Sequence, residues 1–540
     1  MPARTDSARP NFLFFFTDQQ RWDHVGYAGN PVLRTPNIDR IAGGGSWLSR
    51  FYVSSPTCMS NRATFMTGRI PRVNGVRYNG IPLDLDSVTF VDLLLAAGYR
   101  TALIGKSHLQ GMTSEEAKAP REAYPDGLAP PPGELAEARR TAYTRADYAW
   151  EMSQEWARPG HAESIRTPFY GFEDVIFCLG HGDLVTGHYS AWLESRAPGI
   201  NLQPGPAGAR AVSEVRAAQV YQPAIPEELY PTRFIEEETV RWLERHAGSG
   251  RDRPFFLQCS FPDPHHPFTP PGRYYSMYDP EEVELPPSFH TPTRDATPPQ
   301  ARLWEEFERG KESPRWTYPF VTGEPQARDI LAKTYGQIAM IDDAVGAVLD
   351  ALERAGLAGN TVVCFLSDHG EYLGDHGLML KGPMQYQSVV RTPFAWRDPD
   401  PAYNRGQLDE LGSTSDLART VLSRAGLRPY NGVQGVDLCP LLKGEGAVRD
   451  RVLVEYTTQY PYLGFDDLVT VSTLIDHHWR ISVWQNRDWG ELYDLAADPH
   501  ELTNLWSDPG AAPDKEANLV KLIHAIQNHA DTSPWPLSVS

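Results

Sequence analysis

Residues 11–20 read NFLFFFTDQQ, and this stretch decides the fold class. Asn11–Phe16 is a short, continuous apolar run, which is typical of a strand buried on both faces of a sheet. The run passes directly into the polar cluster Thr17–Gln20. The same arrangement recurs where Thr101–Ile104 meets Gly105–His108, where Phe255–Cys259 meets the Pro/His cluster 262–267, and where Thr361–Leu366 meets Ser367–Gly370.

Helices are predicted between these strands. Apolar residues recur at three- and four-residue spacing over Ser87–Ala97 and Ile330–Ala355, and Gly98 and Gly356 follow where helices commonly end. Strands that alternate with helices predict an α/β fold, with a large, mostly parallel or mixed sheet flanked by helices. Side chains that follow the carboxyl ends of such strands gather at one edge of the sheet. The polar clusters therefore predict a single site.

The pattern changes after Gly444. Short strands are predicted at Arg451–Thr457, Leu468–Thr473 and His478–Trp484, and a last helix at Pro513–His529. They predict a smaller antiparallel α+β domain at the C-terminus. We expect an N-terminal tail over residues 1–10, a catalytic α/β domain over 11–444 and the small domain over 445–540. Three Pro-rich segments, 119–134, 201–232 and 264–299, are either excursions over the active face that shape the substrate pocket or plain surface linkers.

The composition is that of a globular protein, with 540 residues of which 41% are apolar and 22% charged. This length accommodates one large domain and a smaller one. Acidic residues outnumber basic ones by 69 to 50, a formal net charge of −19. That sign disfavours nucleic acid and anionic membranes as partners, and it leaves room for a local basic pocket.

The five cysteines include no Cys-x-x-Cys pair, which excludes zinc ribbons and thioredoxin-like sites. Sparse cysteines are typical of a reducing compartment. The first ten residues hold no apolar core of a signal peptide, and the run that ends at Phe16 is too short to span a membrane. We therefore expect a cytoplasmic protein.

Residues 55–69, SPTCMSNRATFMTGR, are the most informative for chemistry. Pro56 and Thr57 are residues that open helices, and Gly68 is one that ends them. Cys58 then lies in the first turn, with Arg62 one turn later on the same face. The positive helix end and the guanidinium both favour negative charge at Cys58. Taken alone, such a cysteine is more often a buried, inert side chain.

The sequence around this cysteine resembles the sulfatase family, within the alkaline phosphatase superfamily. That family carries Cys-x-Pro-x-Arg followed by Leu/Met-Thr-Gly-Arg, and this chain has Cys58-Met-Ser-Asn-Arg62 and Met66-Thr-Gly-Arg69. Further motifs follow in family order along nearly the whole chain: Asn11-Phe-Leu, Thr17-Asp-Gln19, Thr35-Pro-Asn-Ile-Asp-Arg40, Gly98-Tyr-Arg-Thr101, Gly105-Lys-Ser-His108, Pro264-His-His-Pro267, Ile341-Asp342, Ser367-Asp-His-Gly370, Lys381, Arg391-Thr-Pro393, Glu491-Leu-Tyr-Asp-Leu495, Asp498-Pro499 and Asn504-Leu505. Each is weak alone, and their joint order carries the resemblance.

The resemblance implies that a formylglycine-generating enzyme oxidises Cys58 to formylglycine, whose hydrate is the nucleophile. One hydrate oxygen attacks sulfur, and the sulfated hemiacetal then loses sulfate as the other oxygen is deprotonated. The chain departs from the family at Ser60, where the maturation motif has proline. We expect conversion nonetheless, because the rest of the motif is retained.

The resemblance also implies a metal site. Asp18 and Asp368 supply hard oxygen ligands at two strand ends. By resemblance, Gln19 and His369 fill the neighbouring ligand positions, and Cys58 completes the set as formylglycine. We expect one divalent ion, Ca²⁺ as in oxygen-rich relatives or else Mn²⁺, which a ring nitrogen favours. The ion would neutralise charge on the sulfate.

Basic residues complete the implied site. Lys106 would bind the sulfate and the hydrate, and His108 would remove the proton that collapses the hemiacetal. His265 and Lys381 would contact the ester oxygen, where charge develops. Asn79 falls where some phosphonate-hydrolysing relatives contact the anion. Three further histidines without a counterpart are expected at the rim or in structural positions: His181, His188 and His266.

Three functions remain open. The first is an arylsulfatase-like hydrolase of small sulfate monoesters. The second is a phosphonate monoester or phosphodiester hydrolase, since those relatives share the Asp-Gln and Asp-His ligand pairs, although they tend to replace the lysine and histidine that Gly105–His108 keeps. The third is an anion-binding pseudoenzyme whose Cys58 stays a thiol. A homo-oligomer is compatible with all three.

Overall fold

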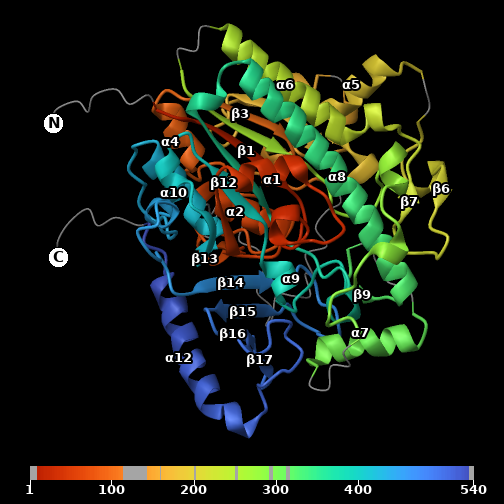
Figure 1. Cartoon of the computed structure of the whole chain (residues 1–540), viewed down its shortest axis with the longest axis vertical. Helices are drawn as coiled ribbons and strands as arrows, with labels where there is room; N and C mark the ends of the chain where they lie inside the picture. The colour runs from red at the N-terminus through yellow and green to blue at the C-terminus, as the bar shows by residue number, and fades with distance from the viewer. Residues whose placement is uncertain are drawn as a thin grey trace, which may run out of the picture.

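The computed structural model describes residues 9–113, 143–158, 160–199, 202–249, 253–290, 296–311 and 317–533. Its centre is a nine-stranded sheet (Figure 1). In spatial order the strands are β13 (Gly406–Ser413), β2 (Ser46–Tyr52), β12 (Phe394–Arg397), β10 (Thr361–Ser367), β1 (Asn11–Thr17), β8 (Phe255–Ser260), β3 (Arg100–Gly105), β4 (Asp174–Leu179) and β5 (Thr186–Gly187). The five strands β10, β1, β8, β3 and β4 run parallel, whereas β12 and β5 run antiparallel to their neighbours. The predicted mixed, mostly parallel sheet is confirmed.

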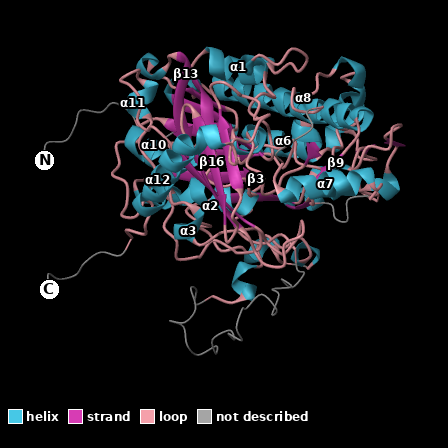
Figure 2. Ribbon diagram, turned by 90° about the horizontal axis from the view of Figure 1, so that it is seen from below, coloured by secondary structure: helices cyan, strands magenta, loops and turns pink. Residues whose placement is uncertain are grey.

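The central strand β1 is buried along its whole length. Phe14 and Phe16 lie on one face, in a cluster with side chains of α2, α4 and α10. Leu13 and Phe15 lie on the other face, with side chains of α1, α6 and α8. The continuous apolar run is thus explained by helices that cover both faces, as Figure 2 shows.

The helices that cover the sheet are α1 (Pro36–Gly43), α6 (Pro231–Gly248) and α8 (Glu324–Arg354) on one face and α2 (Cys58–Thr67), α4 (Phe90–Ala96) and α10 (Leu417–Arg424) on the other. Further α-helices in the described part of the chain are α3 (Pro71–Asn74), α5 (His188–Arg196), α7 (Pro298–Glu308), α9 (Gln387–Val390) and α11 (Cys439–Leu442). Two short antiparallel pairs also form: β6 (Ala211–Val212) with β7 (Tyr221–Gln222), and β9 (Phe320–Val321) with β11 (Leu378–Met379), which lie far apart in sequence. Among the described helices, none joins the length and the apolar composition that crossing a membrane requires.

Two predicted helices form with different first residues. The helix predicted from Ser87 starts at Phe90, because Thr89 caps it: the Thr89 hydroxyl accepts the Asp92 backbone N–H at 3.2 Å, and the Thr89 backbone N–H donates to the Asp92 carboxylate at 2.8 Å. The helix predicted from Ile330 starts six residues earlier as α8, with a proline in its first turn. The apolar spacing from which the helix was predicted did not include residues 324–329.

A second, antiparallel sheet lies at the C-terminal end of the chain, below the large sheet in Figure 1. It consists of β14 (Val452–Thr457), β15 (Thr470–Ile475), β16 (Trp479–Trp484) and β17 (Gly490–Asp494), and α12 (Ala512–Asn528) packs on it. The three predicted strands and the helix are confirmed, and β17 was missed. The backbone N–H of Glu455 donates to the carbonyl of Ser54 at 2.9 Å, so the two sheets are joined. The domain boundary at residue 444 stays a prediction.

The Pro-rich segments differ from one another. Residues 119–134 lie outside the described residues. Residues 265–267 line the cavity described below, whereas no described residue of 202–232 lines it. The expectation that 201–232 shapes the substrate pocket therefore finds no support in the cavity, and this segment instead contains the β6–β7 hairpin.

Candidate active site

Two buried carboxylates meet where β1 and β10 end. Thr17 and Ser367 are paired in the sheet, and the next residues are Asp18 and Asp368. The backbone N–H of Gln19 donates to Asp368 Oδ1 at 3.0 Å, which ties the two turns together. Both carboxylates are fully buried. Two charges at such a depth require compensation by cations or by hydrogen bonds.

Arg62 supplies that compensation from one turn inside α2. Its Nε lies 2.8 Å from Asp368 Oδ2, and its Nη2 lies 3.2 Å from Asp18 Oδ2. Lys106, at the end of β3, places Nζ 2.5 Å from the same Asp18 oxygen. Burial opposes ionisation of Asp18, yet Lys106 and Arg62 hold its pKa well below the usual range. Asp18 is therefore kept ionised inside the protein.

Cys58 is the first residue of α2, with Thr57 at the N-cap, and Gly68 ends the helix with φ of +62°. The predicted helix is confirmed. Cys58 Sγ lies 3.1 Å from His369 Nε2, 3.2 Å from Lys381 Nζ and 3.8 Å from Asp18 Oδ1. Burial and Asp18 oppose the thiolate, but Lys381 and His369 lower the pKa of Cys58 below its usual value. The surroundings of Cys58 therefore stabilise negative charge on the side-chain atom at position 58.

Three of the predicted metal ligands, Gln19, Cys58 and His369, surround the ammonium group of Lys381. Lys381 Nζ lies 2.7 Å from Gln19 Oε1 and 3.0 Å from His369 Nε2, in addition to its contact with Cys58. His369 Nδ1 lies 2.8 Å from the carbonyl of Gly370, so Nδ1–H donates there and Nε2 faces Cys58 and Lys381. The donor atoms of Asp18, Cys58, Asp368 and His369 all lie within 4.8 Å of one another. This cluster of oxygen and nitrogen donors fits a divalent cation, and the thiol of Cys58 is its one soft member.

Gln19 is oriented for this contact by its backbone and by a neighbour. Its φ is +64°, in the left-handed region. Its Nε2 donates to Glu371 Oε2 at 2.9 Å and lies 3.1 Å from His266 Nδ1. The amide oxygen therefore points toward Lys381, which is the orientation that a metal-binding role requires.

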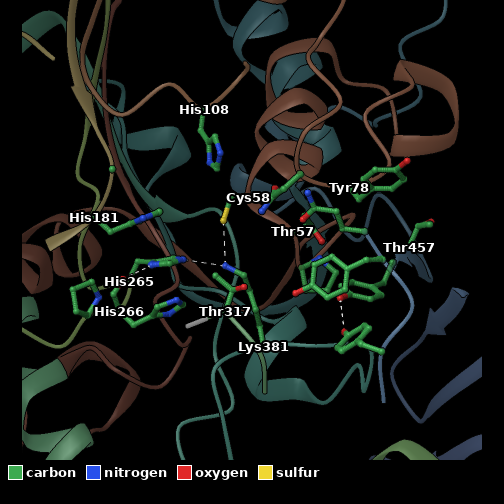
Figure 3. A pocket seen from close by; sticks show the side chains of 18 of the residues that line it. Thr57, Cys58, Tyr78, His108, His181, His265, His266, Thr317, Lys381 and Thr457 are labelled. Carbon is green, nitrogen blue, oxygen red and sulfur yellow. Dashed lines mark hydrogen bonds between the residues drawn. The ribbon is translucent and has the colours of Figure 1, made fainter. Parts of the chain in front are cut away.

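A stack of histidines forms one wall of the site, and Figure 3 shows His181, His265 and His266 on the same side of Cys58. His181 Nε2 lies 2.5 Å from Lys106 Nζ, and the His181 ring is stacked on the His265 ring with centroids 3.7 Å apart. His265 Nε2 in turn lies 3.3 Å from Lys381 Nζ. Burial lowers the pKa of both histidines well below the usual range, so the two rings are neutral. His181 thus belongs to the site, although the sequence predicted a rim or structural position for it.

His108 follows Lys106 by two residues and lines the same cavity. Its φ is +55°, and its Nδ1 is buried without a hydrogen-bond partner among the described residues. Burial, Lys106 and Arg62 lower the pKa of His108 well below its usual value. A neutral imidazole with a free nitrogen is suited to accept a proton.

The remaining predicted residues divide into two groups. Asn79 lines the cavity, and its Oδ1 accepts the backbone N–H of Met59 at 3.1 Å, next to Cys58. His266 also lines it. His188 does not: its Nδ1 accepts the backbone N–H of Phe177 at 2.9 Å, and its ring packs against Trp156. His188 is structural.

Comparison with known proteins decides the family. The sulfatase family model matches residues 10–427, which is most of the chain. The chain belongs to the sulfatase family. This confirms the resemblance seen in the motifs and the predicted enzyme class, the sulfuric ester hydrolases. A second model, for the C-terminal part of N-sulphoglucosamine sulphohydrolase, matches residues 374–529.

Relatives of this sulfatase-family chain match over nearly its whole length. An arylsulfatase from Clostridium perfringens is 27% identical over 503 residues, covering 92% of this chain and 90% of the relative. A multifunctional alkaline phosphatase superfamily protein from Trinickia caryophylli is 26% identical over 547 residues, covering 97% of this chain and 96% of the relative. The solved structure of a phosphonate monoester hydrolase from Silicibacter pomeroyi has a TM-score of 0.74 at 21% identity and covers 97% of this chain and 96% of its own. That likeness shows a shared fold.

A cavity of about 360 Å³ opens beside Cys58. Figure 3 shows the histidines on one side of it and Tyr78, Thr57 and Thr457 on the other. The end of β14 and the loop after it contribute three further tyrosines to the lining, which sequence reasoning missed: Tyr456, Tyr460 and Tyr462. The signal for them is the density of tyrosine in residues 456–462, YTTQYPY, which a search for charged and nucleophilic residues passes over.

Proposed function

We propose that this chain hydrolyses sulfate monoesters in the manner of an arylsulfatase, with position 58 as the nucleophile after oxidation of Cys58 to formylglycine. The observation that carries the proposal is the position of Cys58 at the start of α2, with Sγ 3.2 Å from Lys381 Nζ and 3.8 Å from Asp18 Oδ1. A helix N-terminus and a lysine stabilise an oxygen anion at this point. A thiol, by contrast, is a soft ligand, which matches poorly with the hard cation that Asp18 and Asp368 would bind.

Asp18, Gln19, Asp368 and His369 would hold one divalent ion, with position 58 as the fifth ligand. Calcium suits the oxygen donors best, and manganese is the alternative because of the ring nitrogen. When bound, the ion would supply positive charge to the sulfate oxygens and to the attacking oxygen. Arg62 pairs with both carboxylates and holds them in place for that role.

The remaining site residues bind the ester and move protons. Lys106, held by Asp18 and His181, would bind a sulfate oxygen. Lys381 and His265, 3.3 Å apart, would face the ester oxygen and stabilise the charge that develops as it leaves. His108, neutral and with Nδ1 unpartnered, would accept the proton from the oxygen at position 58 that does not carry the sulfate.

The maturation step is tested by mass spectrometry of the tryptic peptide 51–62 from protein made together with a formylglycine-generating enzyme. We expect an aldehyde in place of the thiol at position 58, and Cys58→Ala should lower kcat by several orders of magnitude. Ser60 makes this test decisive, because it replaces the motif proline inside α2 and its hydroxyl is buried without a partner among the described residues. A fully active protein with an unmodified thiol would refute the mechanism.

A phosphonate monoester or phosphodiester hydrolase is the second candidate. Asn79 in the cavity and the Asp18-Gln19 and Asp368-His369 pairs favour it, whereas Lys106 and His108 favour sulfate. We expect a higher kcat/KM for an aryl sulfate than for the matching phosphonate monoester or phosphodiester. The reverse order would assign the chain to the second candidate. Turnover of neither, with bound sulfate and an intact Cys58 thiol, would assign it to an anion-binding pseudoenzyme.

Two further features belong to this proposal. All five cysteines are buried and free, which supports a cytoplasmic location. A homo-oligomer stays compatible with the proposal and is testable by light scattering.

A further inference from the structure

The cavity beside Cys58 has two walls of different chemistry, which come from different sheets. The histidines and Lys381 belong to the large sheet and its loops, whereas three of the tyrosines belong to residues 456–462, which span the end of β14 of the small sheet and the loop after it. Tyr78 completes this second wall. Leu184, a large apolar side chain with 42% of its surface exposed, lies at the same cavity. We define the tyrosine wall as Tyr78, Tyr456, Tyr460 and Tyr462.

The tyrosine wall is held in place by its own contacts. The hydroxyls of Tyr456 and Tyr462 are bonded to each other at 2.8 Å. The Tyr462 ring packs edge-on against Tyr318 and Tyr460, with centroid distances of 5.0 and 5.6 Å. Because two hydroxyls satisfy one another, the wall offers ring surface to a ligand.

We propose that the tyrosine wall is the subsite for the alcohol part of the substrate, and that it selects a small, uncharged aromatic alcohol. This inference rests on the proposed function for the position of the reacting sulfur next to Cys58. Ring faces and edges bind another ring through stacked or edge-on contacts, which suits a phenolic leaving group. The subsite goes beyond the predicted pocket, which was expected only from the Pro-rich loops.

Charge and size support the same choice. Among the described residues that line the cavity there is no carboxylate and no arginine. A cationic alcohol would therefore meet Lys381 without a compensating acid, and an anionic alcohol would lose its hydration beside the tyrosines without gaining a partner. The volume, about 360 Å³, is at the lower end of the range for ligand pockets and must also hold the sulfate group. A single ring fits these limits.

The test compares phenyl sulfate with butyl sulfate, because the ratio of their kcat/KM values cancels losses common to both esters. In Tyr460→Ala and Tyr460→Leu we expect this ratio to fall about five- to tenfold relative to the wild type. Tyr278→Ala is the matched control, since Tyr278 is a half-buried tyrosine that packs on Tyr335 outside the cavity, and it should leave the ratio unchanged.

An unchanged ratio in both Tyr460 variants would overturn the inference, as would a higher kcat/KM for choline sulfate than for phenyl sulfate. If the chain prefers phosphorus esters, the proposed function fails independently. The phenyl and butyl esters of methylphosphonate then replace the two sulfate esters in the test. The subsite is judged by how the Tyr460 variants change the ratio of their kcat/KM values.

A separate observation concerns the loop that carries His108. The carboxylate of Glu151 is completely buried and accepts three consecutive backbone N–H groups: Oε2 accepts that of His108 at 2.5 Å, and Oε1 accepts those of Leu109 and Gln110 at 3.0 and 2.9 Å. Consecutive N–H groups that converge on one carboxylate form a rigid anion-binding turn. The turn holds His108 at a φ of +55°, which a non-glycine residue adopts only when its surroundings enforce it.

We infer that Glu151 is a positioning residue for His108, and this second inference also rests on the proposed function. Glu151 lies between two short 3₁₀ helices, Arg145–Tyr148 and Glu155–Ala157, about 40 residues after the loop it holds. Glu151→Gln would set an amide N–H against one of the three backbone N–H donors, and Glu151→Ala would leave all three without this acceptor. Either change frees the His108 backbone from its strained conformation.

The test is a double-mutant cycle between Glu151→Ala and His108→Ala. Glu151→Ala should lower kcat about tenfold or more and change KM less than twofold, while having no further effect on kcat when His108 is already alanine. Additive losses in the double variant would mean a general structural role and would overturn the inference. Glu155→Ala is the control, because Glu155 lies in the same segment and pairs with Arg158 instead.

If His108→Ala leaves kcat unchanged, the proposed role of His108 fails, and the positioning role is then decided by crystallography. A His108 ring that keeps its place in the Glu151→Ala crystal structure would refute it. A displaced ring would support it.

Discussion

Arg62→Met should destabilise the metal-free protein by about 3–5 kcal/mol. Arg62 is 1% exposed and pairs with Asp368 at 2.8 Å and with Asp18 at 3.2 Å. Methionine keeps much of the length and the apolar stem but removes the charge. Asp18 would retain Lys106, whereas Asp368 would lose its arginine. Removing one partner of a buried ion pair leaves an uncompensated charge, which is the source of the expected cost.

This cost converts into a measurable shift in the thermal midpoint. The entropy of unfolding is about 2.1 cal/mol/K per residue, or roughly 1.1 kcal/mol/K for this chain, so the midpoint should fall by about 3–4 °C. The measurement is calorimetry in the presence of a chelator at pH 7.5. Arg69→Met is the matched control: Arg69 follows the same helix, and its Nη2 donates to the carbonyl of Asn431 at 2.9 Å. Its loss should shift the midpoint by less than about 1 °C.

The pH dependence of this effect has a defined sign. The pKa of Asp18 is lowered in the folded protein, so its stabilising contribution is complete above the unfolded-state value of about 3.9 and is lost as the pH falls through the folded value. Arg62 is one cause of that lowering. The difference between variant and wild type should therefore be largest at neutral pH and shrink on acidification. A midpoint shift below 1 °C, or a difference that grows on acidification, would refute the reasoning.

Three other changes have defined outcomes. Asp368→Ala should abolish turnover and lose the bound ion while the fold persists, and unchanged metal content by elemental analysis would refute the ligand assignment. The acidic limb of kcat/KM should lie below pH 6.5, because His108 must be neutral to accept a proton and its pKa is lowered, and this limb should disappear in His108→Ala. Gly105→Ala should prevent normal pairing of β3 and β8, since a Cβ there would lie 1.8 Å from the Ser260 carbonyl oxygen. Gly98→Ala, with a similar positive φ and no neighbour within 4 Å, should cost far less by thermal midpoint.

The central sheet could be predicted because its strands are buried on both faces. The run Asn11–Phe16 needs no long-range information to be recognised, and the polar residue after each run marks the edge where a site forms. Asp18 and Asp368 are 350 residues apart in sequence, yet parallel pairing of β1 and β10 places them side by side. The sheet topology thus brings residues that follow separate strands together into one site.

The tyrosine wall and the role of His181 could not be predicted in the same way. Tyr456 and Tyr462 reach the cavity only because the small sheet docks beside the large one, and no local pattern encodes that docking. His181 sits in the site because β4 is the next strand after β3, which brings its ring to Lys106. Both depend on which elements become neighbours, and periodicity carries no information on that.

The distribution of charge shows where substrate choice must be made. The chain carries a net charge of −19, yet around Cys58 the three cations Arg62, Lys106 and Lys381 outnumber the two carboxylates. A sulfate monoester and a phosphonate monoester each bring one negative charge, so this local field attracts both to a similar degree. Discrimination must then come from groups that contact the anion's oxygens and the alcohol in a fixed geometry. In this chain the tyrosines at the end of β14 and in the loop after it line the side of the cavity opposite the histidine stack, so variants in these tyrosines should change the order of substrates more than they change the affinity for anions in general.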